Sequence, residues 1–386
     1  MMGVKMKTKL KYLCKVLGKG NFGAMEKEED GDYPFYVSGE KVYRLNSYSF
    51  KAPFLALSSG GSFYVHYVDE DAALSTHVIA ISGNKINQKF LYFALRGMQD
   101  IVNDLFFYGI GIKNLNLSDL LNVKIKQINL DEQVKIADYL ERETSKIDLL
   151  IDKKSKFVEL LKEKRQALIA QVVTKGLDPN VKMKDSGVEW LGEIPEHWDF
   201  YQVKKIAKIE SGYPFNSALF SSEGFPKDRV IRIRDLSGDE DMIFSKEICP
   251  KNSHIINGDI LIGMDGDFTI HSWDRGEGKL NQRVCAIRCG DIFVQKFLLY
   301  SLATPIKITN DLMYSTTVKH LSQNDIYKIK ITAPGLDEII NIVLFIDSET
   351  ARIDKIIKNI ERSICLLKER RAALITEAVA GKVDCL

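Results

Sequence analysis

The same basic decapeptide occurs twice in this chain, as LLKEKRQALI at residues 160–169 and as LLKERRAALI at residues 366–375. When the sequence is shifted by 206 positions, Leu130–Asp178 aligns with Leu336–Asp384 without a gap, and 19 of the 49 aligned pairs are identical. Similarity at one fixed offset indicates an internal duplication. The chain is therefore expected to fold as two copies of one unit, each ending in the same kind of segment.

The duplication extends upstream of these two segments. At the same offset, GIKNLNLSDL (111–120) aligns with TVKHLSQNDI (317–326), and LSTHVIAI (74–81) aligns with LNQRVCAI (280–287). Near the start of each copy the offset falls to 193, where KLKYLCKVLGKGNFG aligns with QVKKIAKIESGYPFN. The second copy therefore contains an insertion in a loop-rich region, and the repeated unit is a domain followed by a helix.

Each repeated C-terminal segment is predicted to form one long helix. Neither segment contains Pro or Gly before Gly176 and Gly381, and each begins with an acidic turn, which the helix dipole favours. At about 1.5 Å per residue, each helix would be roughly 65 Å long.

Apolar residues recur along both segments at alternating spacings of four and three, which is typical of a coiled coil. Because the two matching seams are separated by a globular domain, we expect the helices to pair antiparallel, with the domains at opposite ends and an approximate twofold axis between the copies. The alternative is that each helix packs only on its own domain. The seam consists of Ile147, Ile151, Val158, Leu161, Leu168 and Val172, then Ile353, Ile357, Ile360, Ile364, Leu367, Leu374 and Ala378, interrupted by Lys154, Arg165 and Arg371.

The rest of each copy is predicted to be an α+β domain. Short stretches such as STHVIAISG and QRVCAIRCG alternate apolar and polar residues between turn residues, and QKFLYFALRGM and QKFLLYSLATP each indicate a helix. The predicted fold is thus two mixed α/β domains separated by two long helices that form an antiparallel coiled coil, in a pseudo-twofold repeat. The expected domains are residues 1–129, the first helix 130–178, residues 179–335, and the second helix 336–386.

The composition places few limits on the partner. The formal net charge is only +2, so a nucleic acid would have to bind a local basic surface. No apolar run approaches the roughly 20 residues that cross a bilayer, which favours a cytoplasmic protein without a membrane partner. The cysteines at 14, 249, 285, 289, 365 and 385 lack metal-site spacing and are expected to be reduced.

No catalytic motif is present in a suitable context. GKGNFG (18–23) matches the glycine pattern of dinucleotide-binding loops, but AMEKEEDGDYP follows it and the second copy reads SGYPFN. We therefore expect a flexible loop, with a nucleotide-dependent enzyme as the less favoured alternative. The chain has no P-loop, HExxH or GxSxG motif, and no metal site is expected.

Three segments of the second copy resemble the specificity subunit of type I restriction-modification systems. They are DSGVEWLGEIPEHWDFYQVKKI (185–206), LDEIINIVLFIDSETARIDKII and LLKERRAALITEAVAGKVD. The resemblance covers essentially the whole chain. It implies that each globular half is a target-recognition domain for double-stranded DNA, and that the two helices are spacers.

The resemblance also implies the partners and cofactors. Two modification (methyltransferase) subunits would carry out adenine methylation with S-adenosylmethionine, and in some systems restriction subunits would cleave DNA with ATP and Mg. This chain is expected to bind no cofactor itself. It departs from the pattern because the first copy lacks the WLGEIPEHW lead-in, whose Trp190, Ile194, Pro195 and Trp198 are expected to pack in the second copy.

Candidate DNA contacts follow from residue types at matching loops of the two copies. Phosphates are bound by Lys, Arg or backbone amides, whereas base edges are read by side chains such as Arg, Asn, Gln or Asp. Arg232 and Arg234 in VIRIRDL would share one face of a strand, with an ordinary salt-bridged face as the alternative. The predicted residues are Lys19, Asn21, Ser58, Ser59, Ser62, His77 and Lys113 in the first copy and Tyr213, Asn216, Arg232, Arg234, Asp265, Asp267, Arg283 and Lys319 in the second.

The duplicated basic clusters are predicted to dock the modification subunits, because a twofold partner arrangement needs two equivalent surfaces. The alternative is a solvated helix face with ion pairs such as Glu159 with Lys162. The predicted docking residues are Lys162, Arg165, Lys368, Arg370 and Arg371.

The combined prediction is a non-enzymatic specificity subunit that reads a bipartite DNA site, one half per domain. The rival hypothesis is a coiled-coil scaffold whose two domains bind proteins.

Overall fold

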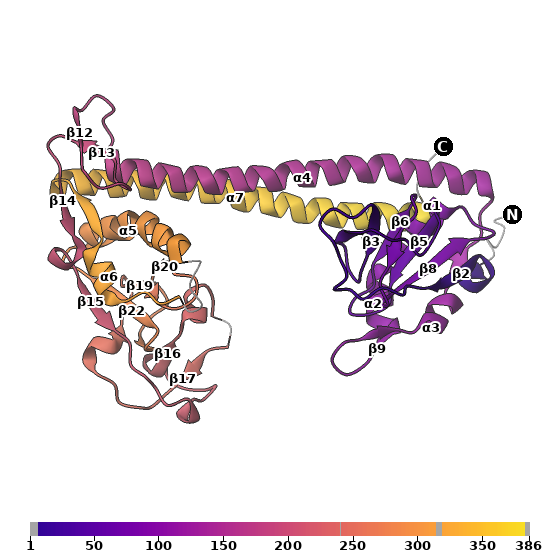
Figure 1. The fold of residues 1–386 in the computed structure, drawn as a ribbon, viewed down its shortest axis with the longest axis horizontal. Coiled ribbons are helices and arrows are strands. Elements are labelled where there is room, and N and C mark those ends of the chain that lie inside the picture. The colour runs from indigo at the N-terminus through magenta and orange to yellow at the C-terminus, as the bar shows by residue number, and fades with distance from the viewer. Residues whose placement is uncertain (1–6, 240, 314–318, 383–386) are drawn as a thin grey trace. The chain divides into compact units, whose positions relative to one another are not determined.

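A computed structural model describes residues 7–239, 241–313 and 319–382. The chain divides into two compact units, and each contains one globular part and a portion of both long helices (Figure 1). Unit 1 comprises Met1–Phe157 and Asn359–Leu386, and unit 2 comprises Val158–Lys358.

Unit 1 is built around a four-stranded antiparallel sheet in the order β2-β8-β5-β6. A three-stranded sheet, β4-β3-β7, lies in the same unit, and its strands β3 and β7 are parallel. The strands are β1 (Lys7–Lys9), β2 (Cys14–Lys19), β3 (Tyr33–Tyr36), β4 (Val42–Leu45), β5 (Phe54–Ser58), β6 (Val65–Val68), β7 (Ala73–Leu74), β8 (Val78–Gly83), β9 (Phe107–Tyr108), β10 (Asn114–Leu115) and β11 (Lys124–Lys126). The helices are α1 (Gln88–Arg96), α2 (Gln99–Phe106) and α3 (Leu117–Asn122).

Unit 2 repeats this plan. Its four-stranded sheet has the order β15-β22-β19-β20, and β16 and β21 again form a parallel pair in a second sheet, β17-β16-β21-β18. The strands are β12 (Met183–Asp185), β13 (Glu193–Pro195), β14 (Asp199–Gln202), β15 (Lys208–Ser211), β16 (Arg229–Ile231), β17 (Ile243–Phe244), β18 (His254–Ile255), β19 (Ile260–Gly263), β20 (Ile270–Ser272), β21 (Gly278–Leu280), β22 (Val284–Arg288) and β23 (Lys330–Ala333). The helices are α5 (Ile292–Leu312) and α6 (Gln323–Lys328).

Short 3-10 helices connect these elements. They are η1 (Leu10–Tyr12) in unit 1 and η2 (Val203–Lys205), η3 (Ser217–Leu219), η4 (Pro226–Asp228), η5 (Ile233–Leu236) and η6 (Lys251–Ser253) in unit 2. The helices predicted in QKFLYFALRGM and QKFLLYSLATP are present as α1 and within α5.

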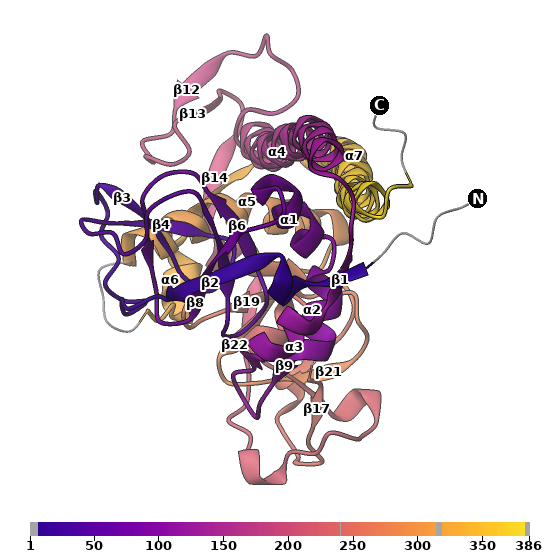
Figure 2. The same ribbon diagram turned by 90° about the vertical axis from the view of Figure 1, so that its right-hand side faces the viewer.

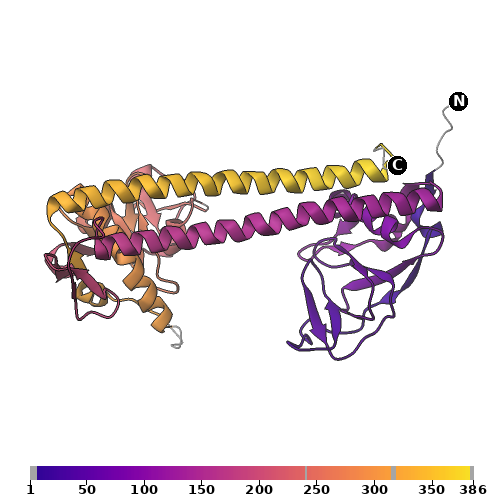
Figure 3. The same cartoon turned by 90° about the horizontal axis from the view of Figure 1, so that it is seen from above.

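The long helices are α4 (Leu130–Lys175) and α7 (Leu336–Val379). In each unit their segments lie side by side and run in opposite directions (Figure 1, Figure 2, Figure 3). An ion pair joins them in both units: Arg371 contacts Asp148 in unit 1 at 2.8 Å, and Arg165 contacts Asp354 in unit 2 at 3.0 Å. These two pairs are equivalent under the 206-residue repeat, and the predicted antiparallel pairing is confirmed within each unit.

Part of the predicted seam is buried in both units. Ile147 is buried in unit 1, and Val158 and Ile353 are buried in unit 2. The core of unit 1 also contains Ile375 and Ala378 of α7, so the helix of the second copy packs on the domain of the first. The alternative in which each helix packs only on its own domain is therefore wrong.

No helix within the described residues is long and apolar enough to cross a membrane. Among the same residues, no cluster of His, Cys, Asp or Glu side chains could hold a metal ion. The cysteines in this part of the chain are free thiols, and Cys385 lies outside the described residues.

Candidate nucleic-acid interface

GKGNFG does not form the predicted loop along its whole length. Gly18 and Lys19 end strand β2, and the backbone N–H of Gly20 donates to the carbonyl of Val78 at 2.9 Å. A Cβ on Gly20 would lie 2.2 Å from the carbonyl oxygen of Ser75, so this close approach of two backbone segments requires glycine. The segment therefore serves sheet packing, and no helix follows it that could bind a pyrophosphate.

The first-copy candidates gather where β5 and β8 meet their loops. The backbone N–H of Ser59 donates to the carbonyl of His77 at 2.7 Å, and Gly61 donates to the carbonyl of Lys113 at 2.8 Å. These bonds bring Lys113 close to His77 although the two residues are far apart in sequence. Of the predicted contacts, Lys19, Asn21, Ser62, His77 and Lys113 are exposed.

Ser58 and Ser59 occupy a different position from these exposed side chains. Ser58 is only 1% exposed, and its hydroxyl accepts a hydrogen bond from the backbone N–H of Gly39 at 3.2 Å. Ser59 is also buried. The Ser58 hydroxyl therefore supports the turn between β3 and β4, and neither serine presents its hydroxyl to solvent.

Unit 2 forms a similar arrangement at the corresponding sheet end. The backbone N–H of Met264 donates to the carbonyl of Arg283 at 2.9 Å, and Gly266 donates to the carbonyl of Lys319 at 3.4 Å. Tyr213 joins this end because its backbone N–H donates to the carbonyl of Leu280 at 2.8 Å.

Carboxylates neutralise much of the positive charge at this end of unit 2. Asp265 lies 3.2 Å from the guanidinium of Arg283 and 2.6 Å from Nδ1 of His320. Asp267 lies 3.3 Å from Nζ of Lys319. Asp265 and Asp267 therefore each form ion pairs with basic side chains. These pairs orient the side chains before any ligand binds.

A polar cavity of about 530 Å³ opens beside these residues. Amide, imidazole and hydroxyl groups can pair with the donors and acceptors on base edges. Its lining includes Ser211, Gln282, His320, Ser322, Gln323 and Asn324, together with Met264 and Tyr327.

The cavity residues were missed by the prediction, although a signal existed. Gln282 and His320 lie directly beside Arg283 and Lys319 in repeated segments, and their counterparts in the first copy are Thr76 and Asn114. A polar residue that changes identity inside an otherwise repeated segment is a mark of a site whose ligand differs between the copies.

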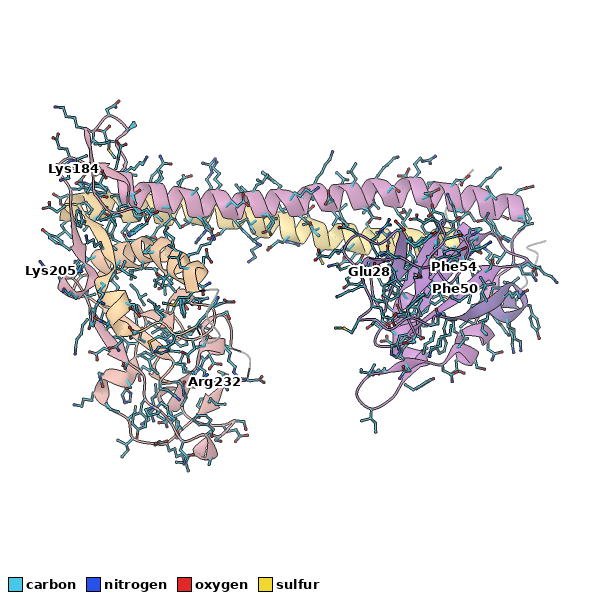
Figure 4. All side chains as sticks on the ribbon, viewed as in Figure 1. Glu28, Phe50, Phe54, Lys184, Lys205 and Arg232 are labelled. Atoms are coloured by element: carbon cyan, nitrogen blue, oxygen red, sulfur yellow. The ribbon has the colours of Figure 1, made fainter. Side chains whose placement is uncertain are left out.

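The prediction that Arg232 and Arg234 share a strand face is wrong. Strand β16 ends at Ile231, and Arg232 instead caps η5. Its guanidinium donates to the buried carboxylate of Asp235 at 2.8 and 3.0 Å and to the carbonyl of Asp241 at 2.6 Å. Because a buried carboxylate needs a cationic partner, Arg232 is held within unit 2 (Figure 4). Arg234, in contrast, is exposed.

The two remaining candidates of the second copy lie in the loop after β15. The Tyr213 ring packs against Phe215 with a centroid distance of 5.0 Å. The Asn216 side chain is exposed and accepts from the backbone N–H of Ala218 at 3.0 Å, capping η3. Local capping therefore orders this loop while leaving the asparagine amide group accessible.

The predicted docking residues of the long helices fall into two groups. Arg165 and Arg371 form the ion pairs between α4 and α7 described above. Lys162, Lys368 and Arg370 are exposed, and Lys162 also contacts Glu159 at 3.0 Å. Only this second group presents its charge outward.

Comparisons with known proteins agree with this architecture. The family model described as "Type I restriction modification DNA specificity domain" matches residues 3–159 and 195–375. The specificity subunit of the type I restriction enzyme EcoBI from Escherichia coli is 30% identical over 203 residues, which is 52% of this chain and 42% of that protein.

A second relative is the specificity subunit of the type I restriction enzyme MjaVIII from Methanocaldococcus jannaschii. It is 25% identical over 226 residues, covering 55% of this chain and 51% of its own length. The matches thus span about half the length of these curated relatives. A solved structure from a study of complex assembly in a type I restriction-modification system has the same fold, with a TM-score of 0.72 at 13% identity over 98% of both chains.

Proposed function

Because this chain belongs to the type I restriction-modification DNA specificity family, we propose that it is the non-catalytic subunit that selects the DNA sequence for such a complex. Each unit would recognise one half of a bipartite duplex site. The chain itself would supply no reacting group.

One observation carries this proposal: two copies of one fold present different polar side chains at corresponding sheet ends. His77 in unit 1 corresponds to Arg283 in unit 2, and Thr76 corresponds to Gln282, and all four residues are exposed. Base edges are distinguished by the pattern of donors and acceptors that face them. A duplicated framework with unlike side chains is therefore suited to reading two different short sequences.

The partners are also a proposal. Lys162 and Lys368 are equivalent in the repeat and exposed on α4 and α7, so two copies of one partner could bind equivalent surfaces. We propose that these partners are two modification subunits, which would bind S-adenosylmethionine, joined in some assemblies by restriction subunits that use ATP and Mg. Since the substrate would be cellular DNA, the complex would act in the cytoplasm.

Mapping of modified bases tests this function. DNA from cells with and without this protein would be sequenced for methylated adenine. A split motif that disappears when the protein is deleted is the expected result. If the methylation pattern is unchanged while the modification subunits are present and active, the proposal is wrong.

A further inference from the structure

Unit 1 contains an apolar hairpin formed by β9 and β10, with the loop sequence GIGIK at residues 109–113. The two strands pair antiparallel, with Phe107 opposite Leu115. Figure 1 and Figure 2 show β9 on the side of unit 1 away from α4. The ring of Phe107 is buried and packs edge-on against Phe63, with a centroid distance of 6.4 Å. The base of the hairpin is therefore anchored in the core of unit 1.

The tip of the hairpin exposes two large aliphatic side chains. Ile110 is fully exposed, and Ile112 is 74% exposed. Contact with an apolar ligand surface would stabilise both, and a β-branched side chain loses little rotational freedom on binding because it is stiff about χ1. Glycines flank Ile110 on both sides, and the φ of Gly111 is +83°, a value that glycine adopts freely. The sequence neighbours of Ile110 thus have no side chains that limit how deeply it enters a narrow opening.

Backbone hydrogen bonds join the hairpin to the candidate DNA-reading end of unit 1. The N–H of Gly61 donates to the carbonyl of Lys113 at 2.8 Å, and the N–H of Leu115 donates to the carbonyl of Ser59 at 3.0 Å. The N–H of Ser59 in turn donates to the carbonyl of His77 at 2.7 Å. The tip is therefore held in a fixed relation to the exposed side chains of His77 and Lys113, and a duplex that contacts them passes beside it.

The charge and size of the tip favour a nucleic acid over a protein as its ligand. Lys113 is the only charged residue between Leu105 and Leu115, and phosphates are bound by lysines. Leu105 of the preceding helix α2 is also exposed, but Asp104 beside it is exposed too and interrupts the apolar surface. A stable protein interface buries roughly 1,200–2,000 Å², which is more than a tip of two isoleucines provides.

We propose that Ile110 is an apolar wedge that enters the base stack of the half-site recognised by unit 1. Isoleucine is one of the side chains that DNA-bending proteins insert between base pairs, where it unstacks the step and kinks the duplex. Pyrimidine–purine steps unstack most readily, so Ile110 favours such a step and adds to specificity without a hydrogen bond to a base. This inference rests on the proposed function, because it requires the complex to bind DNA.

The probe is a duplex with the split motif found by methylation mapping, in which 2-aminopurine replaces one purine at a time in both half-sites. The fluorescence of 2-aminopurine rises when its neighbours unstack. With the assembled complex we expect a rise at one step of one half-site, lost in Ile110→Ser and kept in Ile110→Leu. The adenine to be methylated is excluded from the comparison, because a methyltransferase takes its target base out of the stack.

The affinity for the same duplex gives a second measurement. Ile110→Ser should weaken binding by roughly tenfold, because the variant loses the apolar contact within the stack. The matched control is Tyr12→Ser, since Tyr12 is 61% exposed and lies beside the start of β2, whereas Lys19 ends this strand at the reading end. The control should leave affinity and fluorescence unchanged. Circular dichroism would establish that each variant folds.

Three results would overturn the proposal. If the complex binds the duplex and the fluorescence pattern is the same for Ile110→Ser as for the natural chain, the wedge is wrong and the proposed function stands. Failure of the Ile110→Ser chain to assemble with the modification subunits would assign the tip to a protein partner. Absence of binding between the natural complex and the duplex would contradict both this inference and the proposed function.

Discussion

The two units share one framework but present different chemistry at the same sheet end. In unit 1 the exposed basic candidates are Lys19, His77 and Lys113, and none of them forms an ion pair within the described residues. In unit 2, Asp265 holds Arg283 and His320. The backbone hydrogen bonds that shape both ends are similar, so the side chains can differ without changing the fold. A framework fixed by backbone contacts allows each copy to acquire its own specificity.

The largest effect is expected in unit 2, where Trp198 is 1% exposed in one cluster with Leu191, Ile194 and Val173 and its indole N–H donates to Glu338 at 2.9 Å. Trp198→Ala should destabilise unit 2 by about 3–5 kcal/mol, because it leaves a cavity in a buried cluster and removes a hydrogen bond. The remaining tryptophans, Trp190 and Trp273, both lie in unit 2, so denaturation followed by fluorescence reports that unit. Circular dichroism would follow the whole chain.

Trp190→Ala is the matched control, because Trp190 is only partly buried. It should cost clearly less than the Trp198 variant. Equal losses for the two variants would show that the stability of unit 2 does not depend on the buried indole of Trp198.

The sheet ends predict the next largest effects, on DNA binding by the assembled complex. Arg283→Ala should cost about 1–3 kcal/mol on the preferred sequence and relax one base position. Lys113→Ala should weaken all sequences alike and reduce the slope of log affinity against log salt by about 1. Titrations at several salt concentrations with matched and mismatched duplexes separate the two. Identical behaviour of both variants would remove the distinction between the units.

The fold was largely predictable because each repeated element occurs in two aligned sequences, one in each copy. Gly176 and Gly381 follow the C-terminal ends of the long helices. Strands β8 and β22 lie within the alternating stretches STHVIAISG and QRVCAIRCG. Arg232 was mispredicted because VIRIRDL alternates like a strand, whereas the buried Asp235 three residues later turns the chain into η5. Gln282 and His320 differ from their counterparts Thr76 and Asn114, which marks them in the sequence, but the cavity that they line is made by loops that meet only after folding.

The helix ion pairs predict smaller effects. Arg371 makes two hydrogen bonds to Asp148, at 2.8 and 3.0 Å, whereas the equivalent Arg165–Asp354 ion pair approaches to 3.0 Å without a hydrogen bond from Nε of Arg165. Double-mutant cycles should give a coupling energy of about 1 kcal/mol in unit 1 and about 0.5 kcal/mol in unit 2, since partly exposed pairs are weak and bidentate geometry strengthens them. A larger coupling in unit 2 would contradict this order.

Thiol labelling gives the smallest expected perturbation, because it leaves the native contacts intact. Burial raises the pKa of Cys14 in unit 1 to about 11 and the pKa of Cys285 in unit 2 to about 12. The reactive thiolate is therefore scarce at both positions at pH 8, whereas Cys365 is exposed. Mass spectrometry after brief alkylation should find Cys365 labelled well before Cys14 and Cys285. Rapid labelling of either buried thiol would mean that its unit opens readily.

Selection of DNA by the assembled complex tests the central claim most directly. Duplexes with a long randomised region would be bound and sequenced, first with the natural chain and then with the unit 1 variant Lys113→Ala, Asn21→Ala or the unit 2 variant Arg283→Ala, Gln282→Ala. The account predicts two short preferred blocks separated by unread positions, with each variant altering one block only. A single uninterrupted block, or a change in both blocks from substitutions in one unit, would contradict it.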